Sequence, residues 1–144
     1  MKNIMFTQAL MITIASLSIM TAANADPIVV VVNTTSPVTK LDKEQVANLF
    51  LGKSSSYPDG SAAVPIEQTD ATPAHEEFHK SITEKSASQL KSYWSKMIFS
   101  GKGTAPKEVA SNAELLKLLA SNPAMIGYID KTAVDKSVKV ILAP

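Results

Sequence analysis

The hydrophobic positions of the chain form short continuous runs in some places and follow helical spacing in others. Four apolar runs predict strands, at residues 28–32, 63–67, 125–129 and 138–142. Four segments with apolar residues three or four apart predict helices, at residues 41–51, 72–82, 86–99 and 111–122. The first run is rich in β-branched residues, which is typical of a strand buried on both faces. Because strands and helices mostly alternate, the pattern predicts an α/β fold with a largely parallel sheet flanked by helices.

The helix starts carry recognisable capping signals. Thr72 precedes a proline at the first helical position, which predicts an N-cap. Ser86 with Gln89, and Ser111 with Glu114, match the capping-box pattern. These signals fix where three of the four predicted helices should begin.

The first 25 residues have the pattern of a secretory signal peptide. Lys2 precedes an apolar run over residues 4–20, and Ala23-Asn24-Ala25 is a cleavage signal. We therefore expect a signal peptide at 1–25, cleavage before Asp26, and a single domain at 26–144 in the periplasm, with no membrane insertion after cleavage. A retained membrane anchor is the alternative interpretation of the same run.

The composition excludes several classes of function. Residues 26–144 carry 13 Lys and 13 Asp or Glu, so their formal charge is zero and no basic block is present to bind nucleic acid or anionic lipid. The chain has no Cys, which excludes disulfides, thiolate nucleophiles and Cys-ligated metals. It also has no Arg, the residue that binds phosphate and carboxylate through a bidentate fork. No cofactor is predicted.

Four stretches resemble one lobe of the type 2 periplasmic binding proteins, and most closely the phosphate-binding proteins of ABC transporters. They are Val31-Val32-Asn33, Leu49-Phe50-Leu51-Gly52-Lys53, Thr69 to Phe78, and Pro123-Ala124-Met125-Ile126-Gly127-Tyr128-Ile129. The resemblance implies a single three-layer lobe with a mostly parallel sheet. It also implies a non-enzymatic domain that binds a small anion, such as phosphate, or another small polar ligand.

The family's anion-binding loop has the pattern R-x-D-x-S-G-T, and this chain matches it in part. Gln68 stands at the Arg position, Asp70 at the Asp and Thr72 at the Ser, while Pro73 and Ala74 replace the Gly and Thr. Ligands of parallel sheets bind beyond the carboxyl ends of strands, and the loops at 33–37 and 68–74 both meet that condition. The candidate ligand contacts from these two loops are Thr35, Ser36, Gln68, Thr69, Asp70 and Thr72.

A second motif, a possible metal site, lies on the predicted helix that follows this loop. His75-Glu76-Glu77-Phe78-His79 matches H-E-x-x-H, in which two His one turn apart bind zinc. The chain has only these two His, so a third ligand would have to be Asp or Glu; Glu108 and Glu114 lie at plausible distances but within no recognisable motif. The favoured interpretation is a chance match on a solvated helix face, so we predict no metal at His75 and His79 and no requirement for zinc in folding.

Three functional hypotheses therefore remain open. The first is an exported ligand-binding domain that serves phosphate uptake or sensing, with a membrane transporter, sensor or envelope protein as partner. The second is an interaction module that kept the fold and lost the ligand. The third is a zinc metallohydrolase that uses the H-E-x-x-H match. Function depends on the site and not on the fold, so the sequence does not decide between them.

Overall fold

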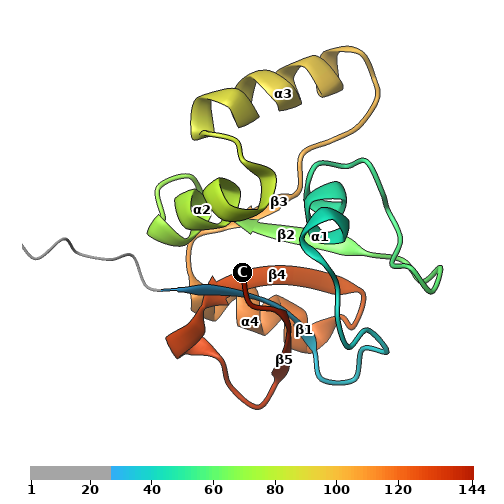
Figure 1. Ribbon diagram of the computed structural model, residues 1–144, viewed down its shortest axis with the longest axis vertical. Helices are drawn as coiled ribbons and strands as arrows, with labels where there is room; N and C mark the ends of the chain where they lie inside the picture. Colours follow the sequence, from blue (N-terminus) through green and yellow to red (C-terminus); the bar gives the residue numbers. More distant parts are fainter. Residues whose placement is uncertain (1–26) are drawn as a thin grey trace, which may run out of the picture.

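The computed structural model describes residues 27–144, and Figure 1 draws residues 1–26 as a grey trace. The predicted signal peptide and its cleavage point before Asp26 lie outside the described residues. Within residues 27–144, no helix combines the length and the apolar character that crossing a membrane requires.

Five strands form one sheet in the order β3-β2-β4-β1-β5. The strands are β1 (Ile28–Asn33), β2 (Val64–Gln68), β3 (Lys107–Val109), β4 (Met125–Asp130) and β5 (Val138–Leu142). The helices are α1 (Lys43–Phe50), α2 (Pro73–Phe78), α3 (Ala87–Phe99) and α4 (Asn112–Ser121), with a π-helical turn η1 (His79–Thr83) and a 3-10 turn η2 (Lys131–Ala133). The sequence predicted all of these except β3, η1 and η2.

Strand direction in this sheet is mostly, but not wholly, parallel. β2 pairs in parallel with β3 and β4, whereas β1 pairs antiparallel with both β4 and β5. Four strands therefore share one direction and β1 alone runs against them. The predicted α/β lobe with a mostly parallel sheet flanked by helices is confirmed. Because β1 is reversed, its carboxyl end and the carboxyl end of β2 lie at opposite ends of the strands in the sheet.

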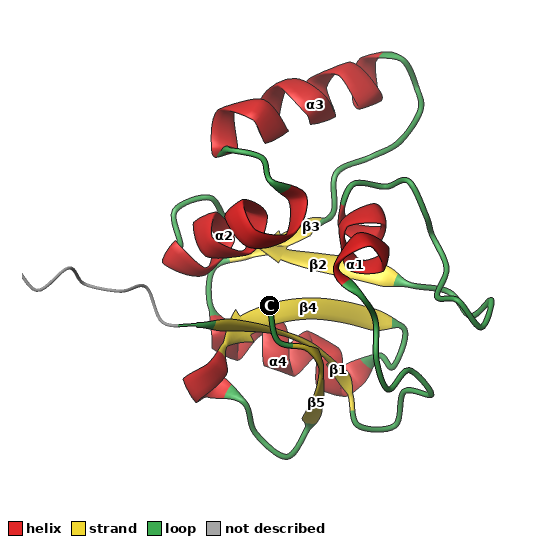
Figure 2. Ribbon diagram, in the orientation of Figure 1, coloured by secondary structure: helices red, strands yellow, loops and turns green. Residues whose placement is uncertain are grey.

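Two hydrophobic clusters cover the two faces of the sheet, which makes three layers (Figure 2). α1 and α2 pack on one face and α4 on the other. β1 contributes to both clusters, because Val30 and Val32 point to the α1 and α2 side while Val29 and Val31 point to the α4 side. The sequence-based prediction of a strand buried on both faces is thus confirmed.

α3 lies outside these layers, above α1 and α2 in Figure 1. Its predicted capping box forms, with Ser86 and Gln89 exchanging side-chain and backbone hydrogen bonds. Leu90 is its one buried residue, and the Tyr93 hydroxyl donates to the Leu51 carbonyl at 2.6 Å. The second predicted box forms only in part: Ser111 caps α4, but the Glu114 carboxylate accepts from the Ala110 N–H instead of the N-cap N–H.

Candidate functional site

β2 carries a carboxylate to the face of the sheet that α2 covers. Side chains alternate along a strand, so Ile66 enters the cluster beneath α4 while Glu67 points to the opposite face. Glu67 is only 4% exposed. A buried carboxylate requires partners that compensate for its lost hydration, and two histidines from the next element supply them.

α2 and η1 present His75 and His79 to that carboxylate. Thr72 caps α2, since its hydroxyl accepts from the His75 N–H at 3.3 Å. The two His are one turn apart and are 5% and 2% exposed. The prediction that they lie on a solvated face is wrong. The buried face of this helix is wide enough to include both positions beside Ala74 and Phe78, and Glu67 faces them from the sheet.

The three side chains form a compact cluster. His79 Nε2 lies 2.6 Å from Glu67 Oε1, and His75 Nε2 lies 3.7 Å from Glu67 Oε2. The two imidazole rings are 4.5 Å apart between centroids. His79 Nδ1 is also held, at 2.8 Å from the Thr83 hydroxyl. Both Nε2 atoms therefore face one carboxylate, while Nδ1 of His79 is hydrogen-bonded to Thr83 in the same helix.

The electrostatics of the cluster favour an ionised carboxylate. Burial acts to raise the pKa of Glu67, but the imidazoles of His75 and His79 act in the opposite direction and hold that pKa below its usual value. Tyr128 forms the apolar wall nearby, stacked on Phe78 at 4.0 Å, and burial together with the charge of Glu67 raises the pKa of its phenol. Glu67 is thus a negative charge enclosed by aromatic and imidazole rings.

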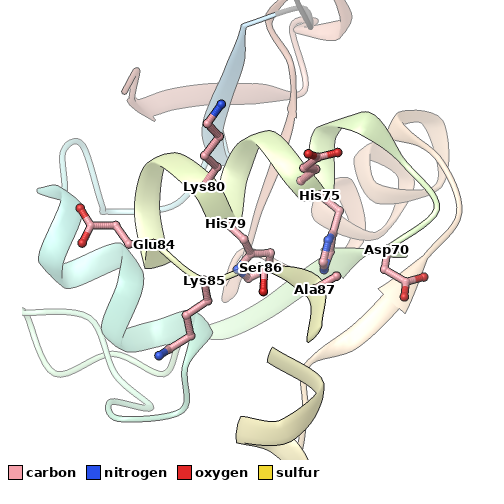
Figure 3. Close-up of a pocket in the computed structure, with 9 residues that line it drawn as sticks. Asp70, His75, His79, Lys80, Glu84, Lys85, Ser86 and Ala87 are labelled. Atoms are coloured by element: carbon pink, nitrogen blue, oxygen red, sulfur yellow. The ribbon is translucent and has the colours of Figure 1, made fainter. Parts of the chain in front are cut away.

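A cavity of about 480 Å³ opens over this cluster (Figure 3). It lies between the loop after β2, the helix formed by α2 and η1, and the start of α3. The lining residues are Asp70, His75, Glu76, His79, Lys80, Glu84, Lys85, Ser86 and Ala87. His75 and His79 belong both to the cavity wall and to the buried cluster, so the cavity connects solvent with the two imidazoles.

Of the predicted ligand contacts in the second loop, Asp70 lines this cavity. The Thr72 hydroxyl is already engaged, because it donates to the Thr69 carbonyl at 3.0 Å while it caps α2. Gln68 points to the α4 side of the sheet, where its amide donates to Asn112 at 2.8 Å and to the Tyr128 carbonyl at 3.1 Å. An arginine at position 68 would therefore extend away from the cavity.

The first predicted loop does not join the second. Because β1 runs against β2, Thr35 and Ser36 lie at the opposite edge of the sheet from Asp70. Both residues serve local turns: the Asn33 side chain accepts from the Thr35 N–H and hydroxyl, and the Ser36 hydroxyl accepts from the Val38 N–H. Two loops could share a ligand if β1 and β2 ran in the same direction, because both loops would then leave the same end of the sheet. β1 is antiparallel, so the two loops do not lie together.

Sequence reasoning missed Glu67 as the partner of the two His. It considered Glu108 and Glu114, but both are exposed, and Glu114 accepts a hydrogen bond from a backbone N–H near its own helix. The available signal was position: Glu67 ends an apolar run directly before the loop that leads to the helix with both His. That arrangement places its carboxylate under the following helix.

The fold is similar to part of several solved phosphate-transport proteins. A Clostridium perfringens protein assigned as a phosphate ABC transporter substrate-binding protein, solved with bound phosphate, matches with a TM-score of 0.65 and 20% identity over 81% of this chain. An ABC-type phosphate transport receptor from Vibrio cholerae matches with a TM-score of 0.63 and 22% identity, and PstS from Borrelia burgdorferi with 0.60 and 14%, each over 81% of this chain.

At identities this low, the TM-scores show a shared fold and nothing beyond it. The chain spans a little under half of each of these proteins, 44%, 45% and 46% respectively. No protein-family model matches the sequence, and no curated protein matches it significantly. The sequence-based resemblance to phosphate-transporter binding proteins is thus confirmed at the level of fold.

Proposed function

We propose that this domain is an exported ligand-binding module that holds a small anion or polar ligand in the cavity beside Asp70. The observation that carries the proposal is the cavity itself, which lies at the carboxyl end of β2, where α/β folds bind their ligands. Its volume of about 480 Å³ falls in the range of small-molecule sites. The likeness to phosphate-transport proteins supports phosphate as the first anion to test.

The lining has both donors and acceptors. Lys80, Lys85 and Ser86 offer donors, whereas Asp70 and Glu84 offer carboxylate acceptors. A hydrogen phosphate ion carries acceptor oxygens and one hydroxyl donor, so a lining with both donors and acceptors satisfies it better than it satisfies sulfate, which is fully deprotonated and only accepts hydrogen bonds. We therefore expect phosphate to bind more tightly than sulfate.

The affinity should be modest. The chain contains no Arg, so no bidentate charge-assisted fork can hold the ligand. A single lobe also leaves one side of the ligand in water. We expect a dissociation constant no tighter than about 1 µM, or about −8 kcal/mol.

Isothermal titration calorimetry with phosphate and sulfate tests this proposal. Lys85→Gln removes a cation from the cavity lining and should weaken phosphate binding about tenfold, since a hydrogen bond to a charged group contributes ~1.5–3 kcal/mol. Lys91→Gln is the matched control, because Lys91 is exposed on α3 outside the lining. Absence of phosphate heat from the unmodified chain, or equal losses from both variants, contradicts the proposal.

The cellular role follows from the same proposal. The N-terminal pattern supports export to the periplasm. A domain there with this fold would deliver its ligand to a membrane transporter or report its concentration to a sensor. Mass spectrometry of the periplasmic fraction should find Asp26 as the N-terminal residue, whereas an intact Met1 would contradict export with cleavage.

One observation favours the interaction module as a second candidate. Phe99 is 96% exposed and Ile98 54% exposed at the end of α3, the helix outside the three layers. Under this alternative no anion gives heat, and a photo-crosslinking residue at position 99 attaches to an envelope protein in cells. The same residue placed at position 91 should not.

A further inference from the structure

We propose that Glu67, His75 and His79 form a binding site for a divalent transition-metal ion, with Zn²⁺ as its best-matched occupant. Their ligand atoms, one from each residue, all lie within 4.8 Å of one another, and all three side chains are buried. This inference is independent of anion binding and replaces the sequence-based expectation that the H-E-x-x-H match is accidental.

The hydrogen bonds around His79 leave a place for a cation. The Thr83 hydroxyl lies 2.8 Å from His79 Nδ1 and 3.2 Å from the His79 carbonyl, so it can donate to the carbonyl while Nδ1 donates to it. A neutral imidazole has one N–H, and Nε2 then directs a lone pair at Glu67 Oε1, 2.6 Å away. In this tautomer both lone pairs are available to a metal ion placed between the two atoms.

The donor set is the one that zinc accepts. Two imidazole nitrogens and one carboxylate oxygen are the protein ligands of zinc sites that keep a fourth position open. The spacing of His75 and His79 puts both Nε2 atoms on one side of the helix, as the H-E-x-x-H pattern requires. The Thr83 hydroxyl fixes the orientation of the His79 ring, which is the usual task of a group hydrogen-bonded to a metal-bound histidine.

The distances require a small adjustment. With zinc–ligand bonds of about 2.0–2.2 Å, tetrahedral ligand atoms lie ~3.3–3.5 Å apart. The separation of 3.7 Å between His75 Nε2 and Glu67 Oε2 is close to this value, whereas that of 2.6 Å between His79 Nε2 and Glu67 Oε1 must widen. An increase of about 0.7 Å is within reach of a rotation of the Glu67 carboxylate.

The cavity provides the route for the ion. His75 and His79 both line it, so an ion from solvent reaches the cluster without unfolding of the domain. The fourth coordination position then faces the cavity and can hold water. Figure 3 draws His75 and His79 on the same helix, next to Ser86 and Ala87 at the start of α3.

Calorimetric titration of Zn²⁺ into the chelator-treated chain, purified without a histidine tag and in phosphate-free buffer, tests the site. We expect one equivalent bound with a dissociation constant of about 1 µM or tighter. Glu67→Gln and His79→Gln should each weaken binding at least about 100-fold, because each removes a direct ligand. Glu77→Gln is the control, because it removes a carboxylate that lies between the two His in sequence but outside the cluster. The zinc affinity of this variant should stay within about threefold of that of the unmodified chain.

Cobalt substitution gives an independent readout. Co²⁺ bound to two nitrogens and a carboxylate in a tetrahedral site should show visible absorption bands, and Glu67→Gln should lose them. Circular dichroism checks that each variant folds, and His75→Gln replaces any variant that does not. The proposal is overturned if the unmodified chain gives no heat with 100 µM Zn²⁺. It is equally overturned if the ligand variants bind zinc as tightly as the Glu77→Gln control.

Discussion

The coupling free energy between Glu67 and His79 should be much larger than that of an ion pair on the surface. The structure offers a matched comparison. His79 Nε2 and Glu67 Oε1 are 2.6 Å apart, with side chains 2% and 6% exposed. Lys43 Nζ and Glu84 Oε1 are 3.1 Å apart, with side chains 51% and 75% exposed. The two pairs differ mainly in their access to water.

The expected magnitudes follow from burial. A hydrogen bond to a charged group in a water-excluded site contributes ~1.5–3 kcal/mol, and removal of one partner of a buried pair costs ~3–5 kcal/mol because the other is left uncompensated. Exposed ion pairs contribute only ~0.2–1 kcal/mol. We therefore expect a coupling free energy of about 2 kcal/mol between Glu67 and His79, and less than about 1 kcal/mol between Lys43 and Glu84.

Two double-mutant cycles with alanine, measured by urea unfolding in the presence of a chelator, give these values. Glu84 has a positive φ of 58°, but this backbone effect occurs in both Glu84 variants and cancels in the cycle. His79→Gln can replace His79→Ala if the alanine variant does not fold. A coupling for Glu67 and His79 no larger than that of the surface pair would show that burial does not strengthen this contact.

Three further predictions follow from the packing and the caps. Gly127→Ala should cost ~1–3 kcal/mol in urea unfolding, because an added Cβ would lie 2.7 Å from Leu115 Cδ2 in the core beneath α4; an unchanged midpoint would contradict this contact. Burial, with a smaller effect of Asp59, raises the pKa of Tyr57 to about 12, above its unfolded value of 10.0. The neutral phenol therefore stabilises the fold fully below pH 10, and the stability advantage over Tyr57→Phe should shrink as the pH rises toward 12; a gap independent of pH would count against it. Thr72→Ala should lower the free energy of unfolding by ~1 kcal/mol, since it removes the cap of α2. Thr72→Ser keeps a capping hydroxyl and should retain most of that stability; equal losses from the two variants would contradict the capping role.

Local signals in the sequence predicted most elements of the fold. The β-branched run of β1 predicted a strand buried on both faces, and the Ser86 and Gln89 pair predicted the start of α3, because both depend on neighbouring residues only. β3 was missed because its three residues, Lys107–Val109, include two exposed charged residues and show no apolar run.

The candidate site depended on contacts that local patterns do not contain. An apolar run specifies a buried strand but not its direction, so the reversal of β1 and the separation of Thr35 from Asp70 could not be predicted. The burial of His79 depends on Glu67, twelve residues earlier and on another element. Helical spacing alone placed the histidines beside the apolar stripe, and only the partner on β2 explains why they are buried.

The most direct test of the proposed function is a titration of the ¹⁵N-labelled chain with phosphate, followed by amide chemical shifts in nuclear magnetic resonance spectra. We expect shifts concentrated on amides around the cavity, at Asp70, His75, Ser86 and Ala87, that saturate at micromolar to millimolar phosphate. Amides of Thr35 and Ser36, at the opposite edge of the sheet, should stay unchanged. A spectrum that does not respond to phosphate, or one that responds at Thr35 and Ser36 instead, would contradict phosphate binding in this cavity.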